Sequence, residues 1–167
     1  MSDSPRPTAQ VAPGALTREA LKGPSLKARA LKLLSLREHT RLELERKLGP
    51  HAESAEQLSE ALDALQARGF INEARVVESV VHRRAARLGA SRVRQELQAK
   101  GVAQGAIAEA VQALRSTELA RAREVWAKKF GTPAADAKER ARQVRFLISR
   151  GFAAEVVRRV VQGTDDL

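Results

Sequence analysis

The chain has 167 residues, of which 43% are hydrophobic and 30% charged, and a formal net charge of +10. Such a basic balance points to a polyanionic partner, either nucleic acid or an acidic protein surface, against the alternative of a well-solvated basic surface without a partner. The absence of cysteine excludes disulfides and thiolate chemistry, and five aromatic residues are too few to stack many nucleotide bases.

An apolar frame recurs three times along the chain. In each copy a leucine is followed ten and fourteen positions later by aliphatic residues: Leu48, Leu58 and Leu62; Leu97, Ile107 and Val111; Leu147, Val157 and Val161. This spacing predicts a helix, a short break and a second helix whose two aliphatic residues share one face. Repeats of this period are typical of stacked helical units, so we expect an all-α, elongated and curved array with a core of Leu, Val and Ala.

Breaks in the pattern predict the boundaries of the modules. Prolines and glycines interrupt residues 1–24, so a flexible N-terminal tail is expected there, with at most a transient helical turn at 16–21. The predicted segments after this tail are three-helix modules at 25–71, 72–115 and 116–162, and a C-terminal tail at 163–167.

Helix starts in module one are marked by side chains that can cap a helix. Ser25, Thr40 and Ser54 each stand where a side-chain oxygen can accept from an exposed amide, and Glu or Gln follows the last two at capping-box spacing. The first helix should end near residue 37. Gly49 and Pro50 separate the second helix from the third, and Gly69 can end the third in the left-handed conformation.

Modules two and three repeat the plan. Module two is predicted to hold helices near 72–87, 91–100 and 103–115. Module three should begin at Ser116 or Thr117, break at 131–133, restart with Asp136 as N-cap and break again at Gly151.

Basic residues concentrate in the second and third modules, where Lys and Arg outnumber Asp and Glu by 8 to 4 and by 11 to 7. Ala137, Ala141, Val144 and Ile148 are expected to be buried on the helix after Asp136, and Lys138, Arg142 and Arg145 should form a cationic strip beside them. A second cluster is expected where Gly89 brings Arg83, Arg84 and Arg87 near Arg92 and Arg94. Stabilisation of a helix C-terminus is an equally good reason for Arg84 and Arg87.

No catalytic, metal-binding or cofactor-binding residues are predicted. His39, His51 and His82 lie at no metal-ligand spacing, so each is expected to be solvated or partly packed. Phosphate-binding glycine loops and nucleophile motifs are absent, so no enzyme is expected. No apolar run approaches the roughly 18 residues needed to span a bilayer and no signal-peptide core is seen, so a cytoplasmic location without a membrane partner is expected.

A helix-turn-helix is the alternative interpretation of the short helix pairs. It would place residues from Ser91 or Ala103 onward in the major groove of DNA. No set of side chains there is recognisable as base-reading rather than phosphate-binding.

Four short motifs follow one another in order: Arg37-Glu38-His39-Thr40-Arg41, Arg68-Gly69-Phe70-Ile71-Asn72-Glu73, Arg92-Val93-Arg94-Gln95-Glu96-Leu97, and Arg145-Phe146-Leu147 with Arg150-Gly151-Phe152. Together they resemble the RecX family of recombinase regulators over about residues 27–161. The chain departs from the family pattern at Val76, where an aromatic residue is usual, at Ala90-Ser91, and at Gly49-Pro50-His51, where Lys-Gly is usual.

The resemblance implies three tandem three-helix modules that bind the RecA filament in its helical groove and modulate RecA, usually as an inhibitor. It also implies DNA contact, within the filament or alone, and we expect a monomer. The residues predicted to contact RecA or DNA are Arg83, Arg84, Arg87, Arg92, Arg94, Lys100, Lys128, Lys129, Lys138, Arg142, Arg145 and Arg150. The alternative function is a basic DNA-binding or architectural protein that acts by competing for DNA.

Overall fold

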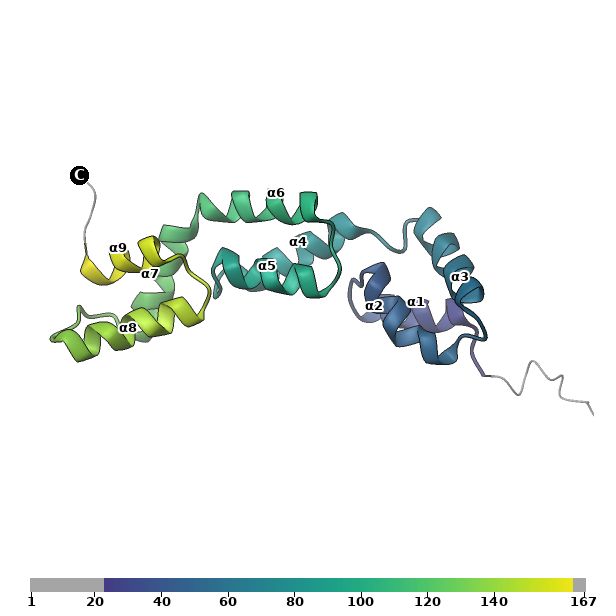
Figure 1. Cartoon of the computed structure of the whole chain (residues 1–167), viewed down its shortest axis with the longest axis horizontal. Helices are drawn as coiled ribbons and strands as arrows, with labels where there is room; N and C mark the ends of the chain where they lie inside the picture. The colour runs from purple at the N-terminus through teal and green to yellow at the C-terminus, as the bar shows by residue number, and fades with distance from the viewer. Residues whose placement is uncertain (1–22, 164–167) are drawn as a thin grey trace, which may run out of the picture.

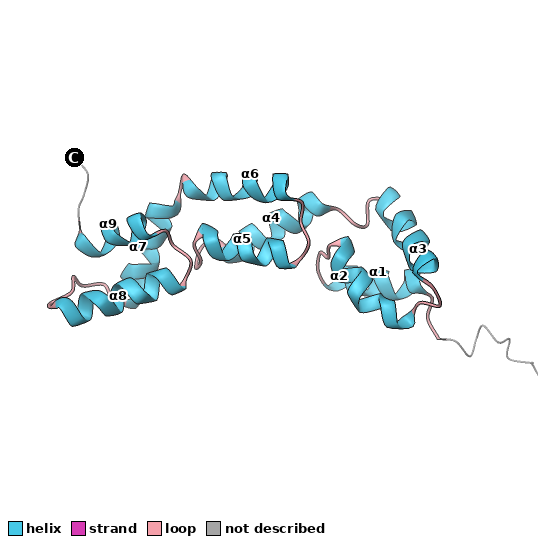
Figure 2. Cartoon of the chain, viewed as in Figure 1, coloured by secondary structure: helices cyan, strands magenta, loops and turns pink. Residues whose placement is uncertain are grey.

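The computed structural model describes residues 23–163, which form nine α-helices and no strand (Figures 1 and 2). The helices line up along one long axis in three consecutive groups. Module one contains α1 (Leu26–Leu36), α2 (Arg41–Leu48), a 3-10 turn (Gly49–His51) and α3 (Ala55–Ala67). Module two contains α4 (Glu73–Arg84), α5 (Ala90–Ala99) and α6 (Gln104–Arg115), and module three contains α7 (Glu118–Lys129), α8 (Ala137–Ser149) and α9 (Ala154–Gln162).

Each module has its own hydrophobic core, and the repeated leucines lie at its centre. Leu48, Leu97 and Leu147 are all buried, each in a separate cluster supplied by the helices of its module. Of the aliphatic residues that follow in the frame, Leu58 alone is half-buried and the others are buried. The apolar frame therefore marks the core, as its spacing predicts, and the cores consist mainly of Leu, Val and Ala.

The predicted capping residues begin their helices. Ser25, Thr40, Ser54 and Asp136 each accept a hydrogen bond from the backbone amide three residues on. The capping box at Thr40 is complete, whereas Gln57 accepts from the amide of Glu53 instead of that of Ser54. Gly69 takes the predicted left-handed conformation with φ of 80°.

Three expectations about local structure were wrong. Helix α4 ends at Arg84, three residues before the predicted end. His39 is neither solvated nor partly packed but buried. Its Nδ1 donates to the carbonyl of Arg37 at 3.0 Å and its Nε2 accepts from Lys47 at 3.3 Å, so the buried ring ties the loop before α2 to the end of that helix.

The buried face of α8 also differs from the prediction. Gln143 and Leu147 are buried, whereas Ala137, Ala141 and Ile148 are exposed and Val144 is half-buried. Gln143 can occupy a core position because its amide oxygen accepts from the indole of Trp126 at 2.9 Å and its amide nitrogen donates to the carbonyl of Thr132 at 3.2 Å. Trp126 and Thr132 lie outside α8, so the helical period of α8 does not reveal them. With these partners, Gln143 is buried in place of the aliphatic residues that the period predicts.

Residues 1–22 of the predicted N-terminal tail, including the turn at 16–21, and residues 164–167 of the predicted C-terminal tail lie outside the described residues. Within residues 23–163, no helix has the length and apolar character required to cross a membrane.

The middle helices of the three modules stand end to end along one edge of the array, in the order α8, α5, α2 (Figure 1). The hydroxyl of Thr40, the N-cap of α2, donates to the carbonyl of Lys100, the C-cap of α5. The amide of Gly89, the N-cap of α5, donates to the carbonyl of Arg150, the C-cap of α8, at 2.8 Å. Each junction therefore pairs the positive end of one helix dipole with the negative end of the next.

An ion pair closes the junction between modules one and two. The carboxylate of Glu43, in the first turn of α2, accepts from Lys100 at 2.9 Å, from Arg37 at 3.0 Å and from the amide of Thr40 at 2.9 Å. Burial alone would raise the pKa of Glu43, but the hydrogen bonds from Arg37, Thr40 and Lys100 outweigh burial and lower this pKa to about 2.

Replacing Glu43 with Gln should destabilise the protein in a pH-dependent way. The folded-state pKa is depressed, so ionised Glu43 stabilises the fold above about pH 4.5, and this stabilisation is lost as the pH falls toward 2. After allowance for solvent screening, we expect Glu43→Gln to reduce the free energy of unfolding by about 1 to 2 kcal/mol at pH 6. Urea unfolding at pH 6 and at pH 2 measures the difference, which should be much smaller at pH 2, where about half of Glu43 in the folded protein is protonated. Glu45→Gln is the control, because Glu45 forms only an exposed pair with Arg41; an equal loss for both variants would contradict the prediction.

More contacts join modules two and three. Arg121 of α7 donates to three carbonyls of module two: those of Ala85 and Leu88 through Nη1, at 2.8 and 2.7 Å, and that of Leu114 through Nη2, at 2.9 Å. Glu118 is buried and accepts from the amide of Ala90 at 2.8 Å. The backbone at the N-terminus of α5 is therefore held by module three.

Candidate polyanion-binding surface

Two adjoining hollows open at the junction of modules two and three. The larger, of about 570 Å³, is lined by Arg84, Arg92 and Arg150 together with Glu96. The smaller, of about 290 Å³, is lined by Arg87, Lys128, Lys129 and again Arg150. Both share Phe146 as a wall. The six cationic residues around Phe146 form the junction surface: Arg84, Arg87, Arg92, Lys128, Lys129 and Arg150.

Helix ends bring these cations together. Arg84 ends α4, Lys128 and Lys129 lie in the last turn of α7, and Arg150 caps α8, so four of the six sit where a helix dipole favours positive charge. Arg92 lies in the first turn of α5, where the dipole disfavours it. Its Nε donates to the carbonyl of Ser149 at 3.0 Å, which fixes its position against the end of α8.

Two aromatic rings hold the cations on the side of module three. The rings of Phe130 and Phe146 meet edge to face with centroids 5.4 Å apart. Lys129 and Arg150 lie over the Phe146 ring at 5.6 and 5.0 Å, and Arg142 lies over the Phe130 ring at 5.7 Å. Both rings are thus in contact with cations.

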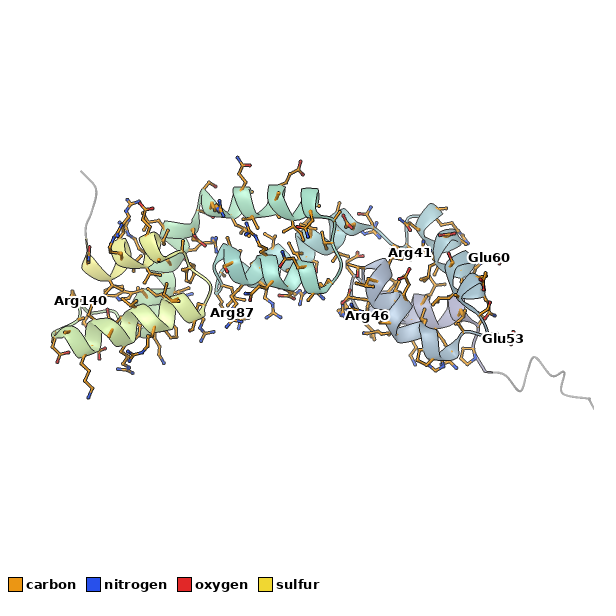
Figure 3. The ribbon with its side chains drawn as sticks, in the orientation of Figure 1. Arg41, Arg46, Glu53, Glu60, Arg87 and Arg140 are labelled. Carbon is orange, nitrogen blue, oxygen red and sulfur yellow. The ribbon has the colours of Figure 1, made fainter. Side chains whose placement is uncertain are left out.

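Most of the cations on this surface lack a carboxylate partner. Glu96 pairs with Arg84 at 2.9 Å and approaches Arg83 at 4.0 Å. Within residues 23–163, no ion pair is formed by the other five members of the junction surface. Figure 3 shows one of them, Arg87, projecting from the array where α5 approaches the end of α8. A cluster of cations with a single acid among them attracts anions of several charges, such as a phosphate backbone or an acidic protein segment.

Comparison of the two junctions shows how the charge arises. Thr40 and Gly89 are equivalent N-caps, so Glu43 and Arg92 occupy the same place three residues further on. Lys100 and Arg150 are the facing C-caps. An acid therefore neutralises the cation at the first junction, whereas at the second junction the acid is replaced by a second cation.

The structure distributes the predicted contact residues over several places. Arg84 and Arg92 line one hollow, as expected from the turn at Gly89, but Arg94 lies on another side beside Arg115 and Glu118. Lys100 is paired with Glu43 at the first junction and only 15% of its side chain is exposed. The remaining predicted residues are exposed on α8, at Lys138, Arg142 and Arg145, or border the junction surface, at Arg83.

Sequence reasoning missed the roles of Glu96, Phe130 and Phe146 at this surface. The sequence contains one indication of the role of Phe146. Arg142, Phe146 and Arg150 follow one another at intervals of four residues, so they share one face of a helix. Among the residues described, no group of three or more His, Cys, Asp or Glu side chains is arranged to hold a metal ion.

A repeat of three-helix modules that join end to end defines a protein of the helical-array class. The RecX model for the third three-helix domain matches residues 116–161, and that for the second three-helix domain matches residues 72–111. The chain is 58% identical to the regulatory protein RecX of Leptothrix cholodnii over 84% of this chain and 90% of that protein. It is 50% identical to the regulatory protein RecX of Ralstonia nicotianae over 92% of this chain and 94% of that protein.

The fold is also similar to that of solved structures. A crystal structure of RecX from Lactobacillus salivarius superposes with a TM-score of 0.70 at 19% identity, covering 83% of this chain and 93% of that chain. The chain belongs to the RecX family of regulatory proteins.

Proposed function

We propose that this chain is a non-enzymatic regulator that binds the groove of the RecA-DNA filament and inhibits RecA in recombination, DNA repair and the SOS response. Membership of a family of regulatory proteins supports this role. The observation that carries the proposed contact is the junction surface, where Arg92 and Arg150 line one hollow and neither forms an ion pair with residues 23–163, whereas Lys100 at the other junction is paired with Glu43. We place the bound protein in the cytoplasm as a monomer.

The shape of the array supports binding along a filament. Its modules extend along one axis (Figure 1), so one molecule can contact several repeating subunits of a helical partner. Several weak contacts on one molecule raise the overall affinity, because each contact after the first is intramolecular. The cations of the junction surface would then face DNA phosphates or acidic side chains within the groove.

The test is DNA-dependent ATP hydrolysis by the cognate RecA on single-stranded DNA in excess, titrated with this protein up to equal stoichiometry. We expect inhibition well below one molecule per RecA, because a regulator bound in the groove acts on a whole stretch of filament. Inhibition only when the protein approaches the concentration of DNA sites would contradict filament binding and indicate competition for DNA.

The second candidate function is DNA binding without RecA, and the unpaired cations of the junction surface favour it equally well. If this function is correct, the affinity of the protein for bare DNA should fall steeply as the salt concentration rises, because binding releases counterions. Binding to RecA-coated DNA no tighter than to bare DNA would make this the better proposal.

A further inference from the structure

A second basic concavity lies in module one, at the opposite end of the array from α7 and α8 (Figure 1). This hollow has a volume of about 290 Å³ and is bordered by α1, the end of α2 and the 3-10 turn. Arg29, Lys32, Lys47 and His51 line it, and no acidic residue does. It includes His51, from the segment where the chain departs from the family pattern. This concavity is called the module-one hollow below.

Leucines form the remaining wall of the module-one hollow. Leu48 is buried in the core and Leu33 is half-buried, but Leu36 is 75% exposed. No other large hydrophobic side chain among the described residues is more than 44% exposed. An apolar group of a partner that covers Leu36 would remove its own surface and that of Leu36 from water, and the hydrophobic effect makes this burial favourable.

One of the cations is held in place from inside the module. Lys47 donates to Nε2 of the buried His39, whose Nδ1 is bound to the carbonyl of Arg37. Burial lowers the pKa of His39, which keeps the ring neutral and able to accept from Lys47. The ammonium group of Lys47, which lines the hollow, is therefore held by His39 before any partner arrives, and this reduces the entropy lost on binding.

We propose that the module-one hollow docks an acidic peptide segment of a partner protein, with one aliphatic or aromatic side chain of that segment seated on Leu36. Carboxylates complement the cations, and a single apolar side chain complements the leucine wall. A phosphodiester backbone would satisfy the cations but leave Leu36 exposed to water, so a peptide fits better than nucleic acid. This site is separate from the junction surface and goes beyond the function proposed above.

The proposal can be tested by NMR titration of the full 15N-labelled chain with the synthetic peptide Ser-Glu-Asp-Glu-Leu-Asp-Glu-Asp-Ser. We expect saturable shifts centred on the amides of Leu33, Leu36, Lys47 and His51. Affinity should fall at least fivefold for a peptide with Ser in place of Leu, and equally for Leu36→Ser in the protein. Leu31→Ser is the matched control, because Leu31 is an exposed leucine of α1 outside the hollow.

Several results would overturn the proposal. These are the absence of saturable shifts, unchanged affinity for Leu36→Ser with its amides still in a folded pattern, and shifts centred on the junction surface. Equal affinity of oligothymidylate for the same amides would assign the hollow to nucleic acid and would also overturn it. Each outcome is independent of ATP hydrolysis by RecA, so failure of this site would leave the proposed function standing.

Discussion

Replacing Gly89 with alanine is expected to destabilise the protein by about 3 kcal/mol, the upper part of the usual range for overpacking a close contact. A Cβ atom on Gly89 would clash with the carbonyl oxygen of Gly151 and the amide nitrogen of Phe152. Both are backbone atoms, so no side chain can rotate away and modules two and three must separate. Thermal unfolding followed by circular dichroism should show a midpoint lower by about 6 to 12 °C for a chain of this size.

Gly105→Ala is the control for this variant. A Cβ atom on Gly105 meets nothing within 4 Å, and the residue lies in the first turn of α6. The substitution should leave stability unchanged or raise it by up to about 1 kcal/mol, since alanine favours the helix. A midpoint for Gly89→Ala within 2 °C of the midpoint for Gly105→Ala would show that the close junction does not form.

Reversal of charge on the smaller hollow is expected to have the largest effect on function. In the triple variant Arg87→Glu, Lys128→Glu and Lys129→Glu, three cations that form no ion pair with residues 23–163 become acidic. Affinity for the RecA filament on single-stranded DNA should fall at least tenfold, because attraction is replaced by repulsion. If these residues contact phosphates, the slope of log affinity against log salt should also decrease by about 2 to 3. Fluorescence anisotropy over a salt series measures both quantities.

A second triple variant controls for net charge. Lys27→Glu, Arg115→Glu and Arg158→Glu change the charge by the same amount at exposed positions on α1, α6 and α9. Long-range electrostatics alone would weaken both triple variants equally, and that result would remove the junction surface from the proposal. A tenfold difference between them would support it. Unchanged helicity by circular dichroism is required of both.

Much of the fold could be predicted from sequence because its determinants are local. The caps at Thr40 and Asp136 act within three residues, and the apolar frame led by Leu97 acts within one module. Where a distant partner intervenes, the prediction failed. Gln143 is buried because Trp126 and Thr132 satisfy its amide, and sequence spacing does not report such partners.

The candidate site was predicted only in part. The surplus of basic residues in modules two and three was visible, and Arg84 and Arg92 were placed together through the turn at Gly89. Lys128 and Arg150 join them from module three, because the end of α8 docks on Gly89. Lys100 had the same sequence signal as Arg150, yet Glu43 neutralises it.

The sequence by itself determined the helices, their caps, the repeated cores and the net positive charge, since each depends on composition or on residues a few positions apart. Tertiary structure alone decided which cations are paired with an acid and which gather at one hollow without an ion pair. Glu43 pairs with Lys100, whereas Arg92 and Arg150 line one hollow and form no ion pair with residues 23–163, in each case across more than 50 residues of chain. The end-to-end docking of the middle helices brings these pairs together, and Coulomb interactions at such short range determine whether a junction is closed by an ion pair or left open to an anion.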